Sequence, residues 1–268
     1  MTSGVADSRD VLARHLADHP DRLLLAERTD WDQARITSAR DAVLLVRDTG
    51  QGDVLMSRGD AAGVGDLLDA EARLRRSVGA GAALWLSAPR TLDVPAAVLD
   101  VLRLTPFSHW DWMWTQEPPA APVLPDGVTL RSLERRPDAP AAREVLRLTN
   151  PRSTADPEGP DEAFWYGAEL DGRLVGAFGA RRELGRGAHG FSWHLHGLGV
   201  LEDVRGLGIG RALTAALARE GLAAGADWIS LGLYAENDGA RRLYRRAGFT
   251  VGAEMRSYGP ATATRPLR

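Results

Sequence analysis

Apolar residues in the second half of the chain recur with two different periods, which predict strands and helices in turn. Alternating or continuous apolar runs predict strands over residues 128–133, 164–170, 173–181, 190–200, 228–234 and 249–258. Apolar residues spaced three and four apart predict helices over residues 141–148, 211–219 and 238–247. Residues 150–160 are polar and rich in proline and glycine, which predicts a loop. The predicted order is therefore strand, helix, loop, three strands, helix, strand, helix, strand.

The first half of the chain shows a similar rhythm. Asp7 or Ser8 can cap a first helix that runs to about residue 18. After it, the pattern predicts a hairpin, a helix, a strand, a helix and a strand, over residues 42–47 with 54–57, 61–77, 82–86, 94–104 and 107–115. On the last of these strands, alternation places Trp110, Trp112 and Trp114 on one face. Such a stripe either packs two halves of a protein together or walls a binding pocket.

A proline-rich segment separates the two halves. Residues 118–125 read Pro-Pro-Ala-Ala-Pro-Val-Leu-Pro, a composition that favours a stiff, extended connector. We therefore expect an N-terminal domain over residues 1–120, a linker over 121–126, a C-terminal domain over 127–258 and a flexible tail over 259–268.

Composition adds mainly exclusions. The chain has 268 residues, of which 44% are hydrophobic and 26% charged, with a net charge of -3, and this is ordinary globular composition. It contains no cysteine and no lysine, which excludes disulfides, thiolate metal sites, a cysteine nucleophile and a lysine Schiff base. The charge gives no sign of a nucleic-acid or membrane-surface partner. Residues 1–10 do not have the pattern of a signal peptide, so we expect a cytoplasmic protein. For its oligomeric state we expect a monomer or a homodimer.

A glycine-rich turn is the strongest candidate for a binding site. The run Arg205-Gly206-Leu207-Gly208-Ile209-Gly210 lies between the predicted strand ending Leu198-Gly199-Val200 and a predicted helix that begins at Arg211. Glycines let successive backbone N–H groups turn towards one point, and the helix N-terminus adds the positive end of its dipole. The spacing fits neither the dinucleotide-binding glycine pattern nor a P-loop, which needs a lysine. The turn therefore predicts a site for a phosphate-bearing ligand of another kind; a tight turn needed only for geometry is the alternative.

Two motifs give this region a family resemblance. The glycine run matches R-x-x-G-x-G, and the segment from Asn237 to Phe249 matches N-x-x-A-x-x-L-Y-x-x-x-G-F. Both are signatures of the GNAT superfamily of acyl-CoA-dependent N-acetyltransferases, which residues 126–258 resemble. The resemblance implies an α+β fold, an α/β/α sandwich with a mixed, mostly antiparallel sheet. It also implies acetyl-CoA as the co-substrate, with no metal.

The resemblance also implies the residues that bind acetyl-CoA. Arg205 and the backbone amides of residues 206–211 would hold the diphosphate, and Asn237, a good helix N-cap, would touch the pantetheine arm. The strand that ends at Val200 would separate from its neighbour and leave the amides of Leu198 and Val200, beside Gly199, for the thioester. Ordinary pairing of the two strands is the alternative.

Two residues are candidates for proton transfer. Tyr244 occupies the family's tyrosine position, and a phenol with an ordinary pKa of about 10 can donate a proton to a departing thiolate. Its alternative role is a core tyrosine. Strand alternation places Ser192, His194, His196, Leu198 and Val200 on one face.

His194 on that face is our candidate general base, and in the related histone acetyltransferases a glutamate occupies its position. A positioned water, Glu202 or a hydrogen-bonded core histidine are the alternatives. His194 and His196 also have the spacing of a metal pair, but the sequence shows no third ligand.

These inferences predict an N-acetyltransferase that moves an acetyl group directly to a primary amine of a small polar molecule. A non-catalytic acyl-CoA-binding regulator and a protein N-terminal acetyltransferase are the alternatives. The first half of the chain would be a degenerate copy of the same fold, because residues 58–65 stand where the anion-binding turn belongs but depart from its spacing. Asp60 in that segment would repel phosphate. The plan of two copies in one chain is similar to that of the mycothiol synthases.

Overall fold

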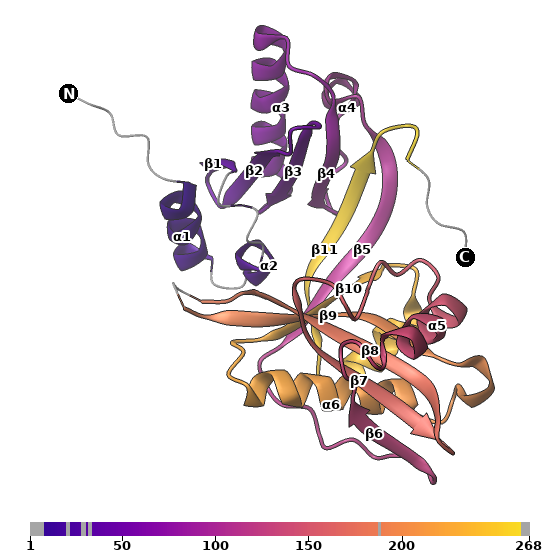
Figure 1. The fold of residues 1–268 in the computed structure, drawn as a ribbon. Helices are drawn as coiled ribbons and strands as arrows, with labels where there is room; N and C mark the ends of the chain where they lie inside the picture. Colours follow the sequence, from indigo (N-terminus) through magenta and orange to yellow (C-terminus); the bar gives the residue numbers. More distant parts are fainter. Residues whose placement is uncertain (1–7, 20–21, 28–30, 32–33, 187–188, 264–268) are drawn as a thin grey trace. The chain divides into compact units, whose positions relative to one another are not determined.

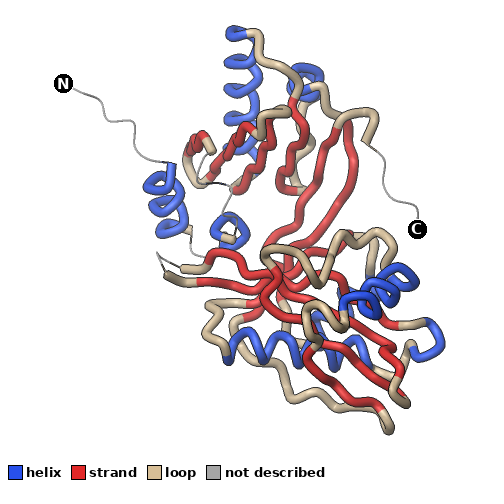
Figure 2. Tube along the Cα trace, in the orientation of Figure 1, coloured by secondary structure: helices blue, strands red, loops and turns tan. Residues whose placement is uncertain are grey.

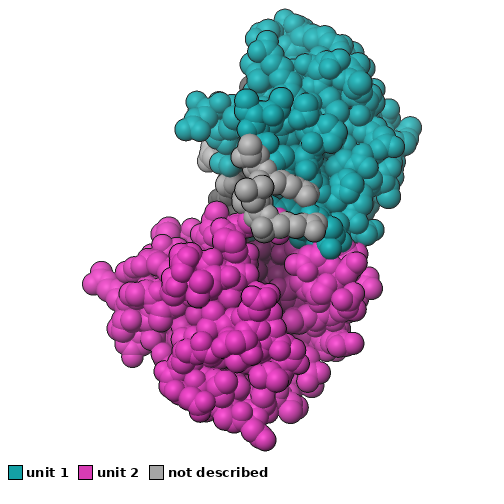
Figure 3. Space-filling model, turned by 90° about the vertical axis from the view of Figure 1, so that its right-hand side faces the viewer, with its two compact units in different colours: residues 1–111, 234–236, 252–265 teal, residues 112–233, 237–251, 266–268 magenta. Residues whose placement is uncertain are grey.

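The structure is a computed structural model that describes residues 8–19, 22–27, 31, 34–186 and 189–263 (Figure 1, Figure 2). The chain forms two compact units. Unit 1 contains residues 1–111, 234–236 and 252–265, and unit 2 contains residues 112–233, 237–251 and 266–268 (Figure 3). Each unit takes strands from more than one part of the sequence.

Unit 1 is a mixed sheet with helices. Its elements are α1 (Ser8–Asp18), α2 (Leu23–Ala26), β1 (Arg35–Ala39), β2 (Ala42–Asp48), β3 (Asp53–Arg58), α3 (Ala61–Val78), β4 (Ala83–Pro89), α4 (Ala96–Leu102), the first part of β5 (Thr105–Thr115) and most of β11 (Thr250–Gly259). The strand order is β1-β2-β3-β4-β11-β5. Strands β3 and β4 are parallel, whereas β1–β2, β2–β3 and β4–β11 are antiparallel. The core is formed by apolar residues of β2, β3, β4, α3 and α4, and Tyr258 of β11 packs into it.

The last strand of the chain belongs to unit 1. Ser257 of β11 accepts a hydrogen bond from the indole of Trp110 at 2.9 Å and pairs with Ser87 at 3.2 Å. Arg256 forms an ion pair with Asp93 at 2.7 Å. The sequence analysis placed residues 249–258 in the C-terminal domain, whereas residues 252–259 of β11 lie in unit 1. The strand pattern is visible in the sequence, but the sheet that a strand joins depends on contacts made far along the chain.

Unit 2 is also a mixed sheet. Besides the end of β5, its elements are β6 (Val128–Ser132), α5 (Ala139–Thr149), β7 (Glu162–Leu170), β8 (Arg173–Leu184), β9 (Phe191–Val200), a 3-10 turn η2 (Glu202–Val204), α6 (Ile209–Ala223), β10 (Ile229–Tyr234) and α7 (Asp238–Arg246). The strand order is β5-β10-β9-β8-β7-β6, in which β9 and β10 are parallel and β6 to β9 are antiparallel.

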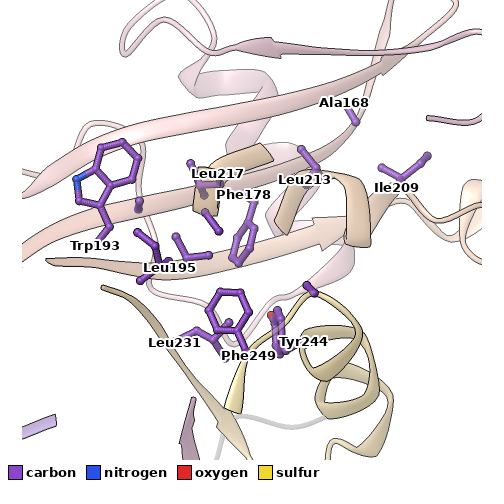
Figure 4. Close-up of a cluster of buried hydrophobic side chains, with 14 of the residues drawn as sticks. Ala168, Phe178, Trp193, Leu195, Ile209, Leu213, Leu217, Leu231, Tyr244 and Phe249 are labelled. Atoms are coloured by element: carbon purple, nitrogen blue, oxygen red, sulfur yellow. The ribbon is translucent and has the colours of Figure 1, made fainter. Parts of the chain in front are cut away.

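Helices cover both faces of this sheet. One core lies against α6 and includes Phe178, Trp193, Leu195 and Leu213 (Figure 4). A second, smaller core lies against α5 and includes Val145 and Trp165. The layers are helix, sheet, helix, so the predicted α/β/α sandwich is confirmed.

Most predicted elements are present within a few residues of the predicted bounds. The pattern missed the short helix α2 and the strand β1. Strand β1 has only five residues, Arg35–Ala39, and they are only partly buried. The helix predicted over residues 94–104 is shorter, because Pro95 precedes its first turn and Arg103 adopts a left-handed conformation with φ of 56°. Of the predicted tail, Gly259 is still part of β11, and residues 264–268 lie outside the described residues.

The tryptophan stripe divides between the units. The Trp110 side chain binds Ser257 in unit 1. In unit 2, Trp112 is buried and its ring stacks on Trp114, with centroids 6.3 Å apart. Each of these two contacts lies within one unit.

Candidate functional site

The glycine run of unit 2 forms a turn with an open end. Gly206 and Gly208 have φ of 83° and 88°, a left-handed conformation that glycine adopts without strain. A Cβ atom added at either position would meet no atom within 4 Å. The side chain of Leu207 between them is 52% exposed. The turn therefore presents its backbone to open space.

This turn leads directly into the N-terminus of α6. Gly208 is the N-cap, and it forms no side-chain hydrogen bond to the helix. The amides of Ile209, Gly210 and Arg211 lie in the first turn, where an α-helix offers no carbonyl partner. Ile209 itself is buried in the core and anchors the helix end. Uncapped N–H groups together with the helix dipole are features that favour anion binding.

Strands β9 and β10 separate close to this turn. Their parallel ladder pairs Ile229 with Trp193 and ends where Leu231 pairs with Leu195, although β9 continues to Val200. On the other side of β9, the amide of Leu201 donates to Val175 of β8 at 2.9 Å. Because hydrogen bonding alternates along an antiparallel strand, the polar groups of Gly199 face β8. Those of Leu198 and Val200 face the gap left by β10.

The two carbonyls that face the gap are occupied. The side-chain amide of Asn150, at the end of α5, donates to the Leu198 oxygen at 3.3 Å. The guanidinium of Arg205 donates to the Val200 oxygen at 3.2 Å. The neighbouring N–H groups of Leu198 and Val200 point into the gap and have no ladder partner there. Arg205, expected to hold a phosphate, thus also fixes the end of β9.

A bulge in β9 overturns the predicted alternation. Gly197 has φ of 72°, and the register with β8 shifts between Ala177 and Gly179. Val200 pairs with Gly176, and a Cβ added at Gly176 would contact α6, so Val200 lies on the α6 face. His196 instead lies next to Trp165 on the α5 face. His194 and His196 therefore do not share a face with Val200. The extra residue at the bulge reverses the face, which the sequence pattern alone does not reveal.

The two histidines have different surroundings. His194 lies in the closed part of the β9–β10 ladder, opposite Ser230, and its Nδ1 lies 2.9 Å from the Ser230 hydroxyl oxygen. His196 lies just beyond the last ladder pair, and its Nε2 lies 3.0 Å from a carboxylate oxygen of Glu162. The same oxygen accepts a hydrogen bond from the Trp165 indole at 2.6 Å. Sequence analysis missed Glu162, which belongs to no motif.

Helix α7 carries the other two candidates. Asn237 is its N-cap, and the side chain accepts a hydrogen bond from the Ala240 amide at 3.1 Å, so the predicted cap is confirmed. Tyr244 packs beside Phe249 in the core under α6 (Figure 4). Burial raises the pKa of its hydroxyl above the ordinary value of 10. Within the described part of the chain, no residue forms a hydrogen bond with that hydroxyl.

Glu202, an alternative candidate for the base, is exposed and lies in the 3-10 turn η2. Its carbonyl accepts a hydrogen bond from the Arg205 amide at 3.2 Å. Across the described ranges, no group of three or more His, Asp or Glu residues is arranged to hold a metal ion. No helix in those ranges is long and apolar enough to cross a membrane.

The chain is similar in sequence to known acetyltransferases. Residues 129–249 match the acetyltransferase (GNAT) family. A mycothiol acetyltransferase of Cellulomonas flavigena is 36% identical over 170 residues, covering 57% of this chain and 49% of that protein. A mycothiol acetyltransferase of Thermobispora bispora is 34% identical over 153 residues, covering 50% of each protein. The chain thus spans about half the length of the curated relatives it matches.

Solved structures resemble the chain over nearly its whole length. A GCN5-related N-acetyltransferase from Kribbella flavida covers 98% of each chain with a TM-score of 0.55 and 21% identity. One from Sphaerobacter thermophilus covers 97% of this chain and 94% of its own, with a TM-score of 0.56 and 21% identity. A tandem GNAT protein from the clavulanic acid biosynthesis pathway covers 98% of each chain with a TM-score of 0.50 and 14% identity. These likenesses show the fold.

Proposed function

We propose that this protein transfers the acetyl group of acetyl-CoA directly to a primary amine of a small polar molecule. The match of residues 129–249 to the GNAT family of acetyltransferases supports this proposal. The observation that carries the proposal is the open end of α6, reached through the turn at Gly206 and Gly208 and lying close to the gap between β9 and β10. These features offer one site for a diphosphate and another for a thioester.

The backbone holds acetyl-CoA. The amides of residues 206–211 and the dipole of α6 bind the diphosphate, and the glycines let it approach the chain closely. The amides of Leu198 and Val200 bind the pantetheine arm and polarise the thioester carbonyl. Asn237, the N-cap of α7, is the residue proposed to touch the same arm. Acetyl-CoA itself supplies an activated acyl group.

Tyr244 is the proposed general acid. Its raised pKa keeps the hydroxyl protonated at neutral pH, so it can donate a hydrogen bond to the sulfur as the C–S bond breaks. The same raised pKa makes complete proton loss costly, so stabilisation of the thiolate by the hydrogen bond carries much of the effect. Since the hydroxyl has no partner within the described residues, its donor is available.

The names of the relatives support the proposed acceptor class. The curated relatives are named for mycothiol, a small molecule, and this supports a small polar amine as the acceptor. Direct transfer is favoured because the chain contains no cysteine that could carry the acetyl group.

The proposal is tested by measuring CoA release from acetyl-CoA across a panel of small amines and short peptides, for the wild type and Tyr244→Phe. We expect turnover with small amines, a kcat about 100-fold lower in Tyr244→Phe, and unchanged affinity for acetyl-CoA in the variant. Turnover of peptides alone would indicate an N-terminal acetyltransferase instead. Tight binding without turnover of any acceptor would indicate a regulator and contradict the proposal.

A further inference from the structure

One histidine of unit 2 is held by a carboxylate at the edge of the open gap. The His196 side chain is 17% exposed, and its Nε2 lies 3.0 Å from Glu162, whose side chain is only 7% exposed. The Trp165 indole fixes the same carboxylate oxygen from the other side. An ionised carboxylate accepts hydrogen bonds but does not donate them. Nε2 therefore carries the ring proton, and Nδ1 carries the lone pair.

The position of this histidine suits a base. His196 follows directly after the last ladder pair of β9 and β10, and it lies two residues before the gap-facing amide of Leu198. It lies on the α5 face of the sheet. The loop after α5 covers this region, since an added Cβ at Gly197 would lie 2.6 Å from Ala155. Tyr244 packs in the core on the opposite, α6 face.

We propose that His196 is the general base of the transfer and that Glu162, anchored by Trp165, is the residue that positions it. The inference rests on the proposed acetyltransferase function and replaces His194 as the candidate base. A base on the α5 face and an acid on the α6 face then flank the gap in which the thioester lies. The acceptor amine approaches from the side of the α5 loop, and the cofactor approaches from the side of α6.

The proton balance of the step is as follows. The acceptor ammonium loses one proton to Nδ1 of His196, which passes it to solvent. The amine nitrogen attacks the thioester carbonyl carbon, and the C–S bond breaks with its electron pair on sulfur. The sulfur takes a proton from Tyr244. The nitrogen releases its second proton as the amide forms, and this proton returns through solvent to the tyrosine.

His194 is the less suitable of the two. Its ring contacts the hydroxyl of Ser230 in the part of the sheet where the two strands are paired. Ser230 is fully buried, so this contact joins the histidine to the packed part of the sheet. A histidine held by a side chain of the paired neighbouring strand supports the fold there.

Variants with matched side-chain amides distinguish the roles of His194 and His196. In His196→Gln, the side-chain amide stands near the position of Nε2, so it can still donate to Glu162, but the basic lone pair is lost. In His194→Asn, the side-chain amide stands near the position of Nδ1 and preserves the contact with Ser230. Glu162→Gln retains an oxygen for Trp165 and His196 but removes the negative charge.

The experiment measures kcat, the acceptor KM, the dissociation constant of acetyl-CoA and the melting temperature of each variant. We expect kcat to fall about 100-fold in His196→Gln and about 10-fold in Glu162→Gln, with KM, acetyl-CoA affinity and melting temperature nearly unchanged. We expect His194→Asn to stay within about 2-fold of the wild type, as the loss of a supporting contact should not change the chemical step. Imidazole added to His196→Ala should restore part of the rate.

Three outcomes overturn the proposal, and they differ from one another. A full kcat in His196→Gln with a large loss in His194→Asn would return the role to His194. Losses of kcat in His196→Gln that accompany a fall in melting temperature, without rescue by imidazole in His196→Ala, would make His196 structural. Absence of turnover in the wild type with every acceptor would instead overturn the proposed function itself.

Discussion

Two helices in this chain begin after a strand and a glycine-containing turn, and their first turns are built in opposite ways. In unit 1, Asp60 caps α3, and its carboxylate accepts a hydrogen bond from the Gly63 amide at 2.7 Å. In unit 2, Gly208 caps α6 without any side-chain hydrogen bond. Both helices connect parallel strands, β3 to β4 and β9 to β10. The scaffold is shared, but of these two helices only α6 lacks a capping side chain.

The space around the two turns differs as well. A Cβ added at Gly59, before α3, would lie 2.4 Å from the Cα of Ala42, and one at Gly63 would lie 2.8 Å from its Cβ. The corresponding positions before α6, Gly206 and Gly208, face open space. Glycine thus serves close packing in unit 1 and access to the backbone in unit 2. The comparison teaches that glycines near a helix start indicate a ligand site only when the cap itself is absent.

The largest expected contrast comes from the same substitution in both turns. Gly59→Ala places a methyl group into the backbone of β2, so we expect it to destabilise the protein by about 3 kcal/mol or more. The methyl group added by Gly206→Ala would meet no atom within 4 Å. We therefore expect a loss of stability of only about 1 kcal/mol, from the strain of the left-handed backbone. Thermal unfolding of both variants measures the difference. Equal destabilisation would mean that the two turns are packed alike.

A second prediction transfers the unit 1 cap to unit 2. Gly208→Asp introduces a carboxylate at the N-cap of α6, where it would occupy the amides and repel phosphate. We expect it to weaken acetyl-CoA binding about 100-fold, equivalent to ~2.7 kcal/mol. Gly208→Asn is the matched control, because asparagine also tolerates the left-handed conformation but carries no charge. Calorimetric titration of both variants tests this, and a similar affinity in the two would remove the electrostatic explanation.

The reverse change in unit 1 should affect stability alone. Asp60→Ala removes the cap of α3 and should cost about 1 kcal/mol, whereas Asp60→Asn should cost little because asparagine is an equally good cap. Neither substitution should change the affinity for acetyl-CoA. Chemical denaturation and titration of the same samples measure both quantities. A change of affinity in either variant would show that unit 1 takes part in cofactor binding.

The smallest expected effect concerns pH. Because burial raises the pKa of Tyr244 above 10, its hydroxyl stays protonated throughout the working range, and kcat should show no loss of the acid up to pH 10. The hydroxyl would lose its proton only above the raised pKa, so the fall of kcat at high pH lies outside that range. A pH profile of kcat with the best acceptor tests this. A decline centred below pH 10 that is absent in Tyr244→Phe would contradict the buried, protonated state.

Much of unit 2 could be predicted from the sequence, because its signals are local. The glycine turn, the N-cap at Asn237 and the strands around them each depend on a few neighbouring residues. Asp60 was also identified as unfavourable for phosphate, and the structure shows it as the cap of α3. Residue types that fix backbone conformation or cap a helix therefore give information without a tertiary context.

The candidate base was harder to predict, because two irregularities in pairing decide its surroundings. The bulge at Gly197 separates the face of His196 from that of Val200. A register shift between Glu162 and Phe164 places Glu162 and Trp165 on the same face, although regular alternation would separate them. Both shifts depend on pairing between strands, which a periodic pattern does not specify. The placement of β11 in unit 1 was missed for a related reason, since its partners in β4 lie more than 150 residues earlier in the chain.

The most direct test of the contrast between the two helix ends is the stoichiometry of acetyl-CoA binding by isothermal titration calorimetry. The wild type and Asp60→Asn should bind one molecule per chain, and Gly208→Asp should lose that site while the protein stays folded. Two sites per chain in the wild type, or undiminished binding by Gly208→Asp, would contradict the assignment of the diphosphate to the open end of α6.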